Sequence, residues 1–172
     1  LEHLDQLYYS VFKPTDSAGW SGNLKRYRLN SKGVIEDVNK DPAVDPATGF
    51  FSETAHSFWT LGSDPDGNEV RAGGAASRLT NTRKVATFLG SNKELLAPTN
   101  AINETNPGLT TDLLATPNTY TSAQVEKLLK WAKGIDVNDQ DNDSLKNDAR
   151  AYMEDPLHSQ PVVINYGKDV IN

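Results

Sequence analysis

Cysteine is absent from the 172 residues of this chain, and histidine occurs only three times, as His3, His56 and His158. Without a thiol the chain can form no disulfide, no zinc–thiolate centre and no cysteine nucleophile. The histidines stand far apart and show no HExxH spacing, which disfavours a catalytic zinc site. The groups that remain for metal chemistry are therefore mainly carboxylates.

Long apolar runs and an excess of positive charge are also missing. No run approaches the roughly 18 residues of a transmembrane helix, so we expect no membrane-spanning segment. The chain has 17 basic and 23 acidic residues and a formal net charge of -6. Nucleic-acid binding relies on a Lys/Arg surface, so we expect no nucleic-acid partner. The chain starts at Leu1 without a signal peptide, and we interpret it as a piece of a longer protein.

Residues 1–90 have the character of short β-strands joined by turn-rich loops. Polar and apolar residues alternate in segments of about six residues, a pattern typical of half-buried strands. Asp66-Gly67 is a strong hairpin signal between two of these segments. The predicted strands are 7–14, 22–30, a short run after Gly33, 57–62, 68–77 and 83–90. We therefore expect a mainly β fold with antiparallel strands.

One clear helix is predicted, at 121–134. Thr121 and Gln124 have the spacing of a capping box, and Gly134 is a typical terminator. Apolar residues recur at helical spacing, as Val125, Leu128, Leu129 and Ala132. Such a stripe is usually a core face, so we expect the helix to pack against the β-strands.

The remaining segments are less regular. Residues 91–120, rich in Asn, Thr, Pro and Gly, are typical of an insertion. Residues 149–154 predict a short second helix, and 161–167 predict a returning strand. We therefore divide the chain into strands at 1–90, an insertion at 91–120, a helix with an acidic loop at 121–155 and a last strand within 156–172.

The acidic loop is the stretch 136–148, which contains five aspartates and three asparagines. Asp139, Asp141 and Asp143 alternate with other residues, as the first ligands of an EF-hand calcium loop do. In that register Leu145 supplies its backbone carbonyl while its side chain points inward, and Asn147 supplies the next ligand. Ca²⁺ takes roughly 6–8 hard oxygen ligands, which suits this stretch. The sequence thus predicts a calcium site.

Two positions depart from the EF-hand pattern. Ser144 stands where glycine normally makes a sharp turn, and Arg150 stands where a bidentate Glu would sit. The missing ligand would come from Asp148, from Asp136 or from water, and a second register through Asp136 and Asn138 stays open. The alternative is a solvated acidic loop, which most charge runs are. The strict alternation favours the ion, because packed carboxylates without a cation repel one another.

A second group of polar residues, Asp155, His158 and Ser159, suggests a hydrolase triad. Triad members meet in space rather than within five residues, and the chain contains no G-x-S-x-G elbow. We interpret these residues as a turn that bonds to backbone. The chain is therefore not expected to be an enzyme.

Several pieces stand in order along the chain: WSGNLKRYRLN (20–30), SFWTLG (57–62), VRAGGAASRL (70–79), the acidic loop and DPLHSQPVVINYG (155–167). Together they resemble the PilY family of type IV pilus biogenesis factors and tip adhesins. The resemblance implies the front part of the family's C-terminal β-propeller, a partial propeller with a small helical insertion that carries an EF-hand-like calcium loop. Asp139, Asp141, Asp143, Leu145 and Asn147 match that loop in one register.

The resemblance also implies a function. In the family, calcium occupancy controls pilus extension against retraction, and the partners are minor pilins and host or surface ligands. The expected location is extracellular, associated with the outer membrane at the pilus tip. Two other hypotheses stay open: a generic calcium-stabilised extracellular module of the dockerin or thrombospondin-repeat kind, and a hydrolase fragment.

Overall fold

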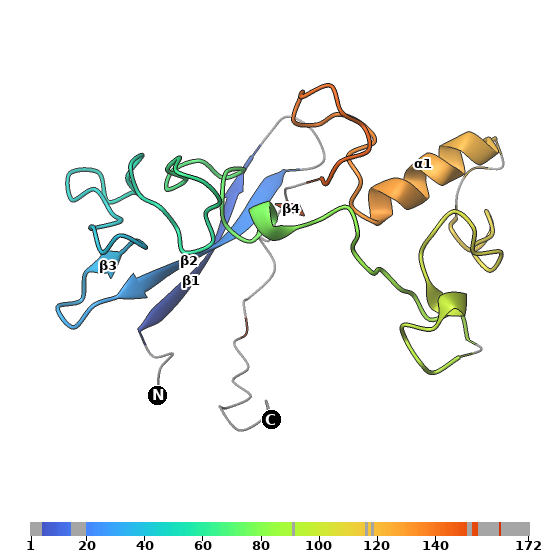
Figure 1. Cartoon of the computed structure of the whole chain (residues 1–172), viewed down its shortest axis with the longest axis horizontal. Coiled ribbons are helices and arrows are strands. Elements are labelled where there is room, and N and C mark those ends of the chain that lie inside the picture. The colour runs from blue at the N-terminus through green and yellow to red at the C-terminus, as the bar shows by residue number, and fades with distance from the viewer. Residues whose placement is uncertain are drawn as a thin grey trace. The chain divides into compact units, whose positions relative to one another are not determined.

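The computed structural model describes residues 5–14, 20–90, 92–115, 117, 119–150, 153–154 and 162. The chain forms two compact units (Figure 1). Unit 1 consists of Leu1–Arg78 together with Tyr152–Asn172, and unit 2 consists of Leu79–Ala151. Unit 2 is therefore an insertion in the sequence of unit 1. We describe each unit by itself.

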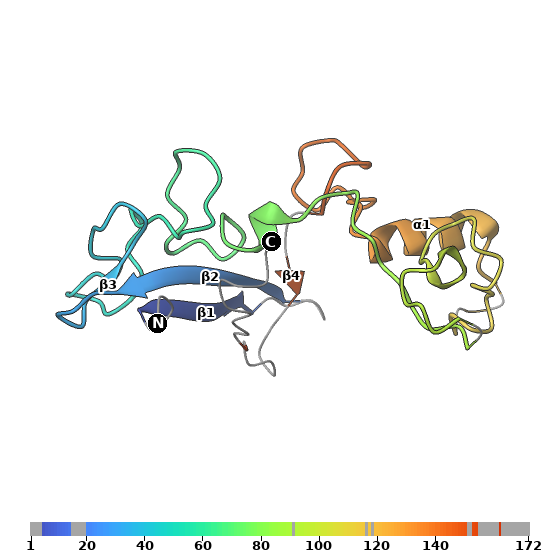
Figure 2. The same ribbon diagram turned by 60° about the horizontal axis from the view of Figure 1, so that its bottom comes forward.

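Unit 1 is built on an antiparallel sheet whose central strand is β2, Ser21–Leu29 (Figures 1 and 2). On one side β2 pairs with β1, Gln6–Lys13, in an unbroken register from Gln6↔Arg28 to Lys13↔Ser21. On the other side it pairs with β3, Ile35–Glu36, and with β4, Met153–Glu154. The prediction of mainly β, antiparallel structure is confirmed at this level.

The apolar core of unit 1 is aromatic and small. Tyr27 of β2 is fully buried and stacks on Phe51, with ring centroids 4.4 Å apart. Tyr9 of β1 meets the same Phe51 edge-on at 5.1 Å. Ala43 and Ala55 complete the buried cluster. The odd-numbered residues of β1 and β2 thus face this core, as the alternation in both segments predicts.

The same face of β2 carries polar residues that are equally buried. Asn23 and Lys25 have no exposed surface. The Asn23 amide donates to the carbonyl oxygens of Val70 (2.9 Å) and Gly73 (3.1 Å). Gly74 approaches so closely that a Cβ there would lie 2.7 Å from Asn23 Oδ1. Buried side chains of β2 therefore hold the irregular segment 66–76 against the sheet.

Three predicted strands are wrong. Residues 57–62, 68–77 and 83–90 form loops and single turns, apart from an isolated bridge between Ala86 and Ala101. The Asp66-Gly67 hairpin is also absent, because both backbone amides donate to the carbonyl of Ala55 instead. Residues 68–77 approach β2 through glycines and end in the short 3₁₀-helix η1, Ala76–Arg78. Tertiary contacts have replaced the local turn.

Unit 2 contains α1, Ser122–Ala132, the only α-helix among the residues that the structure describes. Thr121 and Gln124 form the predicted capping box, with each side chain bonding the backbone N–H of the other residue. Leu129 is the buried member of the apolar stripe. Arg150 contacts Trp131 of α1, and Glu104 contacts Lys133 at the end of the helix; both lie in loops rather than in strands. The prediction that the helix packs on strands is thus not confirmed.

The loops of unit 2 are organised by Asn100, at the end of the 3₁₀-helix η2, Pro98–Asn100. Asn100 is fully buried, and its amide donates to the carbonyls of Asn92 (2.9 Å) and Glu94 (3.0 Å). A buried amide that satisfies several backbone groups can hold a loop without regular structure. This explains how the irregular segment 91–120 keeps a defined path in the residues described.

Near the C-terminus the structure differs from the helix predicted at 149–154. Met153 and Glu154 belong to β4, so the short helix predicted at 149–154 is wrong for these two residues. The strand predicted at 161–167 lies outside the described residues except for Val162. In the described part of the chain, no helix is long and apolar enough to cross a bilayer.

Candidate metal centre

The acidic loop 136–148 of unit 2 begins shortly after the end of α1 and returns to the same point. Ile135 and Ala149 form a bridge at its base. Beyond them, the Asp136 N–H donates to the Asp148 carbonyl at 3.1 Å, and the Arg150 N–H donates to the Gly134 carbonyl at 2.8 Å. The loop is therefore closed at its base by backbone bonds, and its ends are fixed to the terminus of the helix.

Two arginines lie at this base. The Arg150 guanidinium stacks over the Trp131 ring of α1, 4.2 Å from its centroid. Arg83 donates to the carbonyls of Gly134 (2.6 Å) and Arg150 (3.3 Å). Burial, helped by the charge of Arg150, lowers the pKa of Arg83. Gly134 has a φ of 86°, and a Cβ there would overlap the Arg83 side chain, so glycine is required for closure.

The loop brings the three predicted carboxylate ligands together. One oxygen from each of Asp139, Asp141 and Asp143 lies within 4.8 Å of the others. Backbone amides of the loop fix each carboxylate: Asp139 Oδ1 accepts from Ser144 (3.0 Å) and Asp143 Oδ1 from Leu145 (2.7 Å). Asp141 Oδ1 accepts from the N–H of Asp143 at 3.3 Å. The carboxylates therefore converge because the backbone holds them.

The backbone of the loop turns sharply at three residues that are not glycine. Asp139, Asn142 and Ser144 have φ values of 53°, 61° and 73°. Asn and Asp tolerate this left-handed region, whereas serine is less suited to it. Ser144 is the residue that occupies the glycine position of the EF-hand pattern. It adopts the left-handed conformation that glycine would provide there.

Buried oxygen atoms without a hydrogen-bond partner also occur in the loop. They are Asp136 Oδ1, Gln140 Oε1 and Asp148 Oδ1. Asp136 is 1% exposed, and its other carboxylate oxygen accepts from the Gln140 N–H at 2.7 Å. Buried polar atoms are rarely left without a partner, and a bound ion is one of the few explanations. The orphaned atoms here are all acceptors, as a cation requires.

The aspartates of the loop are not neutralised by the protein. Among the described residues, none of the five forms an ion pair. Burial raises the pKa of Asp148, and the charges of Asp143, Asp141 and Asp136 raise it further. These four carboxylates thus share one electrostatic environment with excess negative charge.

Two of the predicted ligands require comment. The Leu145 side chain is 51% exposed, so the prediction that it anchors the loop inward is wrong. The carbonyl of Asn147 accepts from Asn81 Nδ2 at 3.1 Å, and Asn147 itself is exposed. Asn81 and Gln140 carry no signal in the sequence, because neither stands at a ligand position of the calcium pattern. Asp136 and Asp148 are alternative ligands that the sequence predicts.

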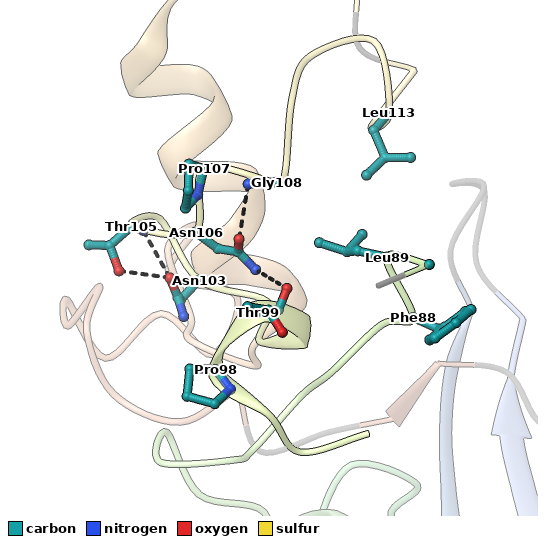
Figure 3. Close-up of a pocket in the computed structure, with 11 residues that line it drawn as sticks. Phe88, Leu89, Pro98, Thr99, Asn103, Thr105, Asn106, Pro107, Gly108 and Leu113 are labelled. Atoms are coloured by element: carbon teal, nitrogen blue, oxygen red, sulfur yellow. Dashed lines mark hydrogen bonds between the residues drawn. The ribbon is translucent and has the colours of Figure 1, made fainter. Parts of the chain in front are cut away.

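Other candidates for chemistry are weaker. The hydrolase group Asp155, His158 and Ser159 lies outside the described residues. A cavity of about 860 Å³ in unit 2 is lined by Phe88, Leu89, Pro98 and Leu113 and shares no residue with the acidic loop (Figure 3). Its polar side chains include Asn103 and Asn106, whose carbonyl oxygens accept from backbone amides of the same segment. None of its lining residues is charged, so it offers no acid, base or strong metal ligand.

Comparison of the chain with protein-family models, with curated proteins and with solved structures gives no match.

Proposed function

We propose that the chain is a calcium-binding structural and interaction module. The observation that carries this proposal is the convergence of the Asp139, Asp141 and Asp143 carboxylates, within 4.8 Å of one another, in a loop with further orphaned oxygens. All available donors are hard oxygens, from carboxylates, an amide and backbone carbonyls. That donor set suits Ca²⁺, and the absence of nitrogen and sulfur ligands in the loop argues against zinc or copper.

The buried oxygens support the fit beyond the three carboxylates. Asp136 and Asp148 stand at the two ends of the loop, and each keeps one buried carboxylate oxygen without a partner. A calcium site needs more ligands than three, and these residues could provide them in place of the Glu that the EF-hand pattern lacks at Arg150. Magnesium fits less well, because it demands a tighter octahedron and gives up water reluctantly.

The site would act by holding the loop together. Five aspartates stand against one lysine, Lys146, in residues 136–148, so an ion that supplies two positive charges offsets their repulsion. The ends of the loop, Asp136 and Asp148, are bonded to each other, and Gly134 and Arg150 are bonded to each other beside them, next to the terminus of α1. Ordering the loop should therefore stabilise the helix terminus and the contact of Arg150 with Trp131.

The wider role follows from the resemblance to the PilY family. On that basis the parent protein would be a type IV pilus-associated surface protein at the pilus tip, outside the cell. Its calcium occupancy would regulate pilus extension and retraction as well as surface attachment, with minor pilins and surface ligands as partners. Unit 1, with its antiparallel sheet, would form part of the propeller.

A generic calcium-stabilised extracellular module is the second candidate. It rests on the geometry of the loop alone and needs no pilus. The two candidates share the calcium site, so the first experiment addresses the ion and the second the biological context.

The ion is tested by isothermal titration of the chain with CaCl₂. Asp141→Ala removes one converging carboxylate and should weaken calcium binding at least about tenfold, which corresponds to ~1.4 kcal/mol. Asp112→Ala removes an exposed aspartate of the same unit outside the loop and should leave binding unchanged. Trp131 fluorescence, recorded in parallel, should respond to calcium in the wild type and in the control. Equal binding by the wild type and Asp141→Ala, or no binding by the folded wild type, would mean a solvated acidic loop.

The pilus role is tested in the intact parent protein. Asp141→Ala there should mimic the calcium-free state and leave the balance of pilus extension and retraction disturbed, as measured by twitching motility and surface piliation. Normal motility despite lost calcium binding would leave the generic module as the function.

A further inference from the structure

Strand β1 forms an outer edge of the sheet in unit 1 (Figure 2). It is eight residues long and pairs with β2 along its whole length. Among the residues that the structure describes, no strand pairs with its other side. This edge does not belong to the acidic loop, and nothing in the calcium proposal uses it.

The hydrogen-bond pattern of β2 determines which groups β1 presents at this edge. The carbonyls of Leu24 and Arg26 accept from Ala75 and Phe58, so the even-numbered residues of β2 point away from β1. In an antiparallel ladder the residues that bond to the neighbouring strand alternate with those that point away. The register pairs even with even residues, for example Ser10 with Leu24. Ser10 and its even-numbered neighbours therefore direct their N–H and C=O groups outward.

Over residues 6–12 this edge lacks the usual protection against strand addition, and Lys13 and Pro14 limit it at its C-terminal end. Natural proteins interrupt exposed edges with charged side chains, prolines, bulges or short strands. Between Gln6 and Phe12 the sequence is QLYYSVF, without a charge or a proline, and its register with β2 has no bulge. An uncharged, regular edge of this length is one that another strand can extend.

We propose that β1 pairs with β1 of a second copy of this chain, in an antiparallel arrangement whose two-fold axis passes through Ser10. The outward groups of Tyr8, Ser10 and Phe12 then meet those of Phe12, Ser10 and Tyr8 of the other copy. Each of these three pairs exchanges two bonds, giving about six hydrogen bonds across the interface. The two β1 strands would then lie side by side at the centre of one continuous sheet.

The side chains of β1 suit this register. Tyr8 faces Phe12 on one side of the sheet and Tyr9 faces Val11 on the other, and aromatic and β-branched pairs are favourable across antiparallel strands. Lys13 faces Leu7, so no like charges oppose one another. In this register Pro14, which has no N–H, lies opposite Gln6 at the end of the ladder, and a shift toward the C-terminal end of β1 would bring it further inside, opposite Tyr8. The pattern of side chains, charge and donors therefore favours the axis at Ser10.

The expected complex is weak. A single pair of eight-residue strands buries less than the roughly 800 Å² per partner of a standard stable interface. We therefore expect a reversible dimer with a dissociation constant between about 10 µM and about 1 mM. Sedimentation analysis of the whole chain, in the presence of calcium, should show a concentration-dependent rise from monomer to dimer.

Substitutions at Ser10 test the interface directly. Ser10→Pro removes an outward N–H and leaves the bonds between β1 and β2 in place, so it should weaken dimerisation at least about tenfold. Ser10→Ala keeps the N–H and should dimerise as the wild type does. Far-ultraviolet circular dichroism confirms that each variant keeps its sheet.

A charge-exchange pair covers the case in which Ser10→Pro fails to fold. Ser10→Lys and Ser10→Glu each place like charges opposite one another at the two-fold axis, so each alone should be monomeric. An equimolar mixture should form dimers, because the two charges are then opposite. Recovery in the mixture is specific to this register.

Three outcomes would overturn the proposal. One is a wild type that stays monomeric up to about 1 mM. Another is a dimer that Ser10→Pro, Ser10→Lys and Ser10→Glu leave unchanged. If the monomer protects the Tyr8, Ser10 and Phe12 amides from hydrogen exchange, the edge is covered within one chain and the second copy is excluded. Loss of calcium binding in Asp141→Ala should not affect any of these results, so failure here and failure of the calcium site are distinguishable.

Discussion

Lys25 and Asp66 form an ion pair inside unit 1: Lys25 Nζ lies 3.4 Å from Asp66 Oδ2, and both side chains are 1% exposed. Lys25 Nζ also donates to the backbone carbonyls of Asp66 and Glu69. Asp66 accepts from the Ser57 N–H (2.7 Å) and hydroxyl (2.8 Å) and from the Thr60 hydroxyl (2.5 Å). The pair thus connects β2 to two segments that have no regular structure.

Removing one member of this pair should be strongly destabilising. Asp66→Ala leaves the Lys25 charge buried without its partner, which typically costs about 3–5 kcal/mol in the free energy of unfolding. The double variant Lys25→Met/Asp66→Ala should lose less than the sum of the two single variants, because no uncompensated charge remains. Urea denaturation followed by circular dichroism measures all three. Additive losses would show that the two charges do not interact.

Asp66 should also make unit 1 sensitive to acid. Burial by itself would raise the pKa of Asp66, but hydrogen bonds from Thr60 and Ser57 and the charge of Lys25 outweigh it, so the pKa lies below its ordinary value. A carboxylate with a lowered pKa contributes stability that is complete above its unfolded pKa of ~3.9 and is lost as the pH falls below it. The free energy of unfolding should decline below about pH 4. A Lys25→Met/Asp66→Ala chain should show a shallower decline.

Tyr27 provides the opposite test, in alkali. Its ring is fully buried and its hydroxyl has no hydrogen-bond partner. Burial raises the pKa of Tyr27, and the charges of Asp66 and Asp37 raise it further. The folded state therefore keeps this proton above about pH 10, where the unfolded state releases it, and stability falls as the pH rises past that value.

Tyr27→Phe should remove this alkaline loss and cost less than about 1 kcal/mol at pH 7, because an unsatisfied buried hydroxyl is deleted. Urea denaturation at pH 7 and at about pH 10.5 compares the two proteins. Burial lowers the pKa of Lys25, which acts on alkaline stability in the opposite sense, and this effect is common to both proteins and cancels in their difference. A loss of more than about 2 kcal/mol at pH 7 would mean that the hydroxyl is bonded, for instance through water.

Ser144 should respond to substitution through its backbone. Its φ of 73° costs a residue with a side chain roughly 1 kcal/mol relative to glycine. Ser144→Gly should therefore raise the calcium affinity by about fivefold, and Ser144→Val should lower it by at least as much. Isothermal titration gives both values. A glycine variant that binds no better than the wild type would show that the backbone strain at Ser144 does not differ between the free and the loaded loop.

Asp148 should distinguish the empty loop from the loaded one. Burial raises its pKa, and the charges of Asp143, Asp141 and Asp136 raise it further, so its charge is unfavourable when no cation is present. Asp148→Asn should leave the melting temperature in chelator unchanged or higher. The same substitution should reduce the rise in melting temperature that calcium produces. The reason is that it changes the Asp148 carboxylate, which has one buried oxygen without a partner and is a proposed calcium ligand.

Asp112→Asn, outside the loop, serves as the matched control for this measurement. An undiminished calcium-induced rise in Asp148→Asn would show that this carboxylate does not contribute to the site.

The sequence by itself determined the elements whose signals are local. β1 and β2 follow from alternation, since a period of two exposes one face to the core wherever the strand lies. The helix at Ser122–Ala132 follows from its capping box and apolar stripe. The convergence of Asp139, Asp141 and Asp143 was predictable because it needs only three alternating residues and a tight backbone.

Only the tertiary structure decided the rest. Asp66-Gly67 has the composition of a hairpin turn, yet Asp66 bonds to Lys25, 41 residues away, because a buried lysine requires an anion. Leu145 is exposed although the EF-hand pattern places it inward, since the loop is held by backbone bonds at its base rather than by an apolar anchor. Gln140 carries no local signal, and the orphaned oxygens of Asp136 and Gln140 arise from the closure of the loop between Ile135 and Ala149. Such contacts depend on which groups, distant in the sequence, are buried together. A short stretch of sequence does not contain this information.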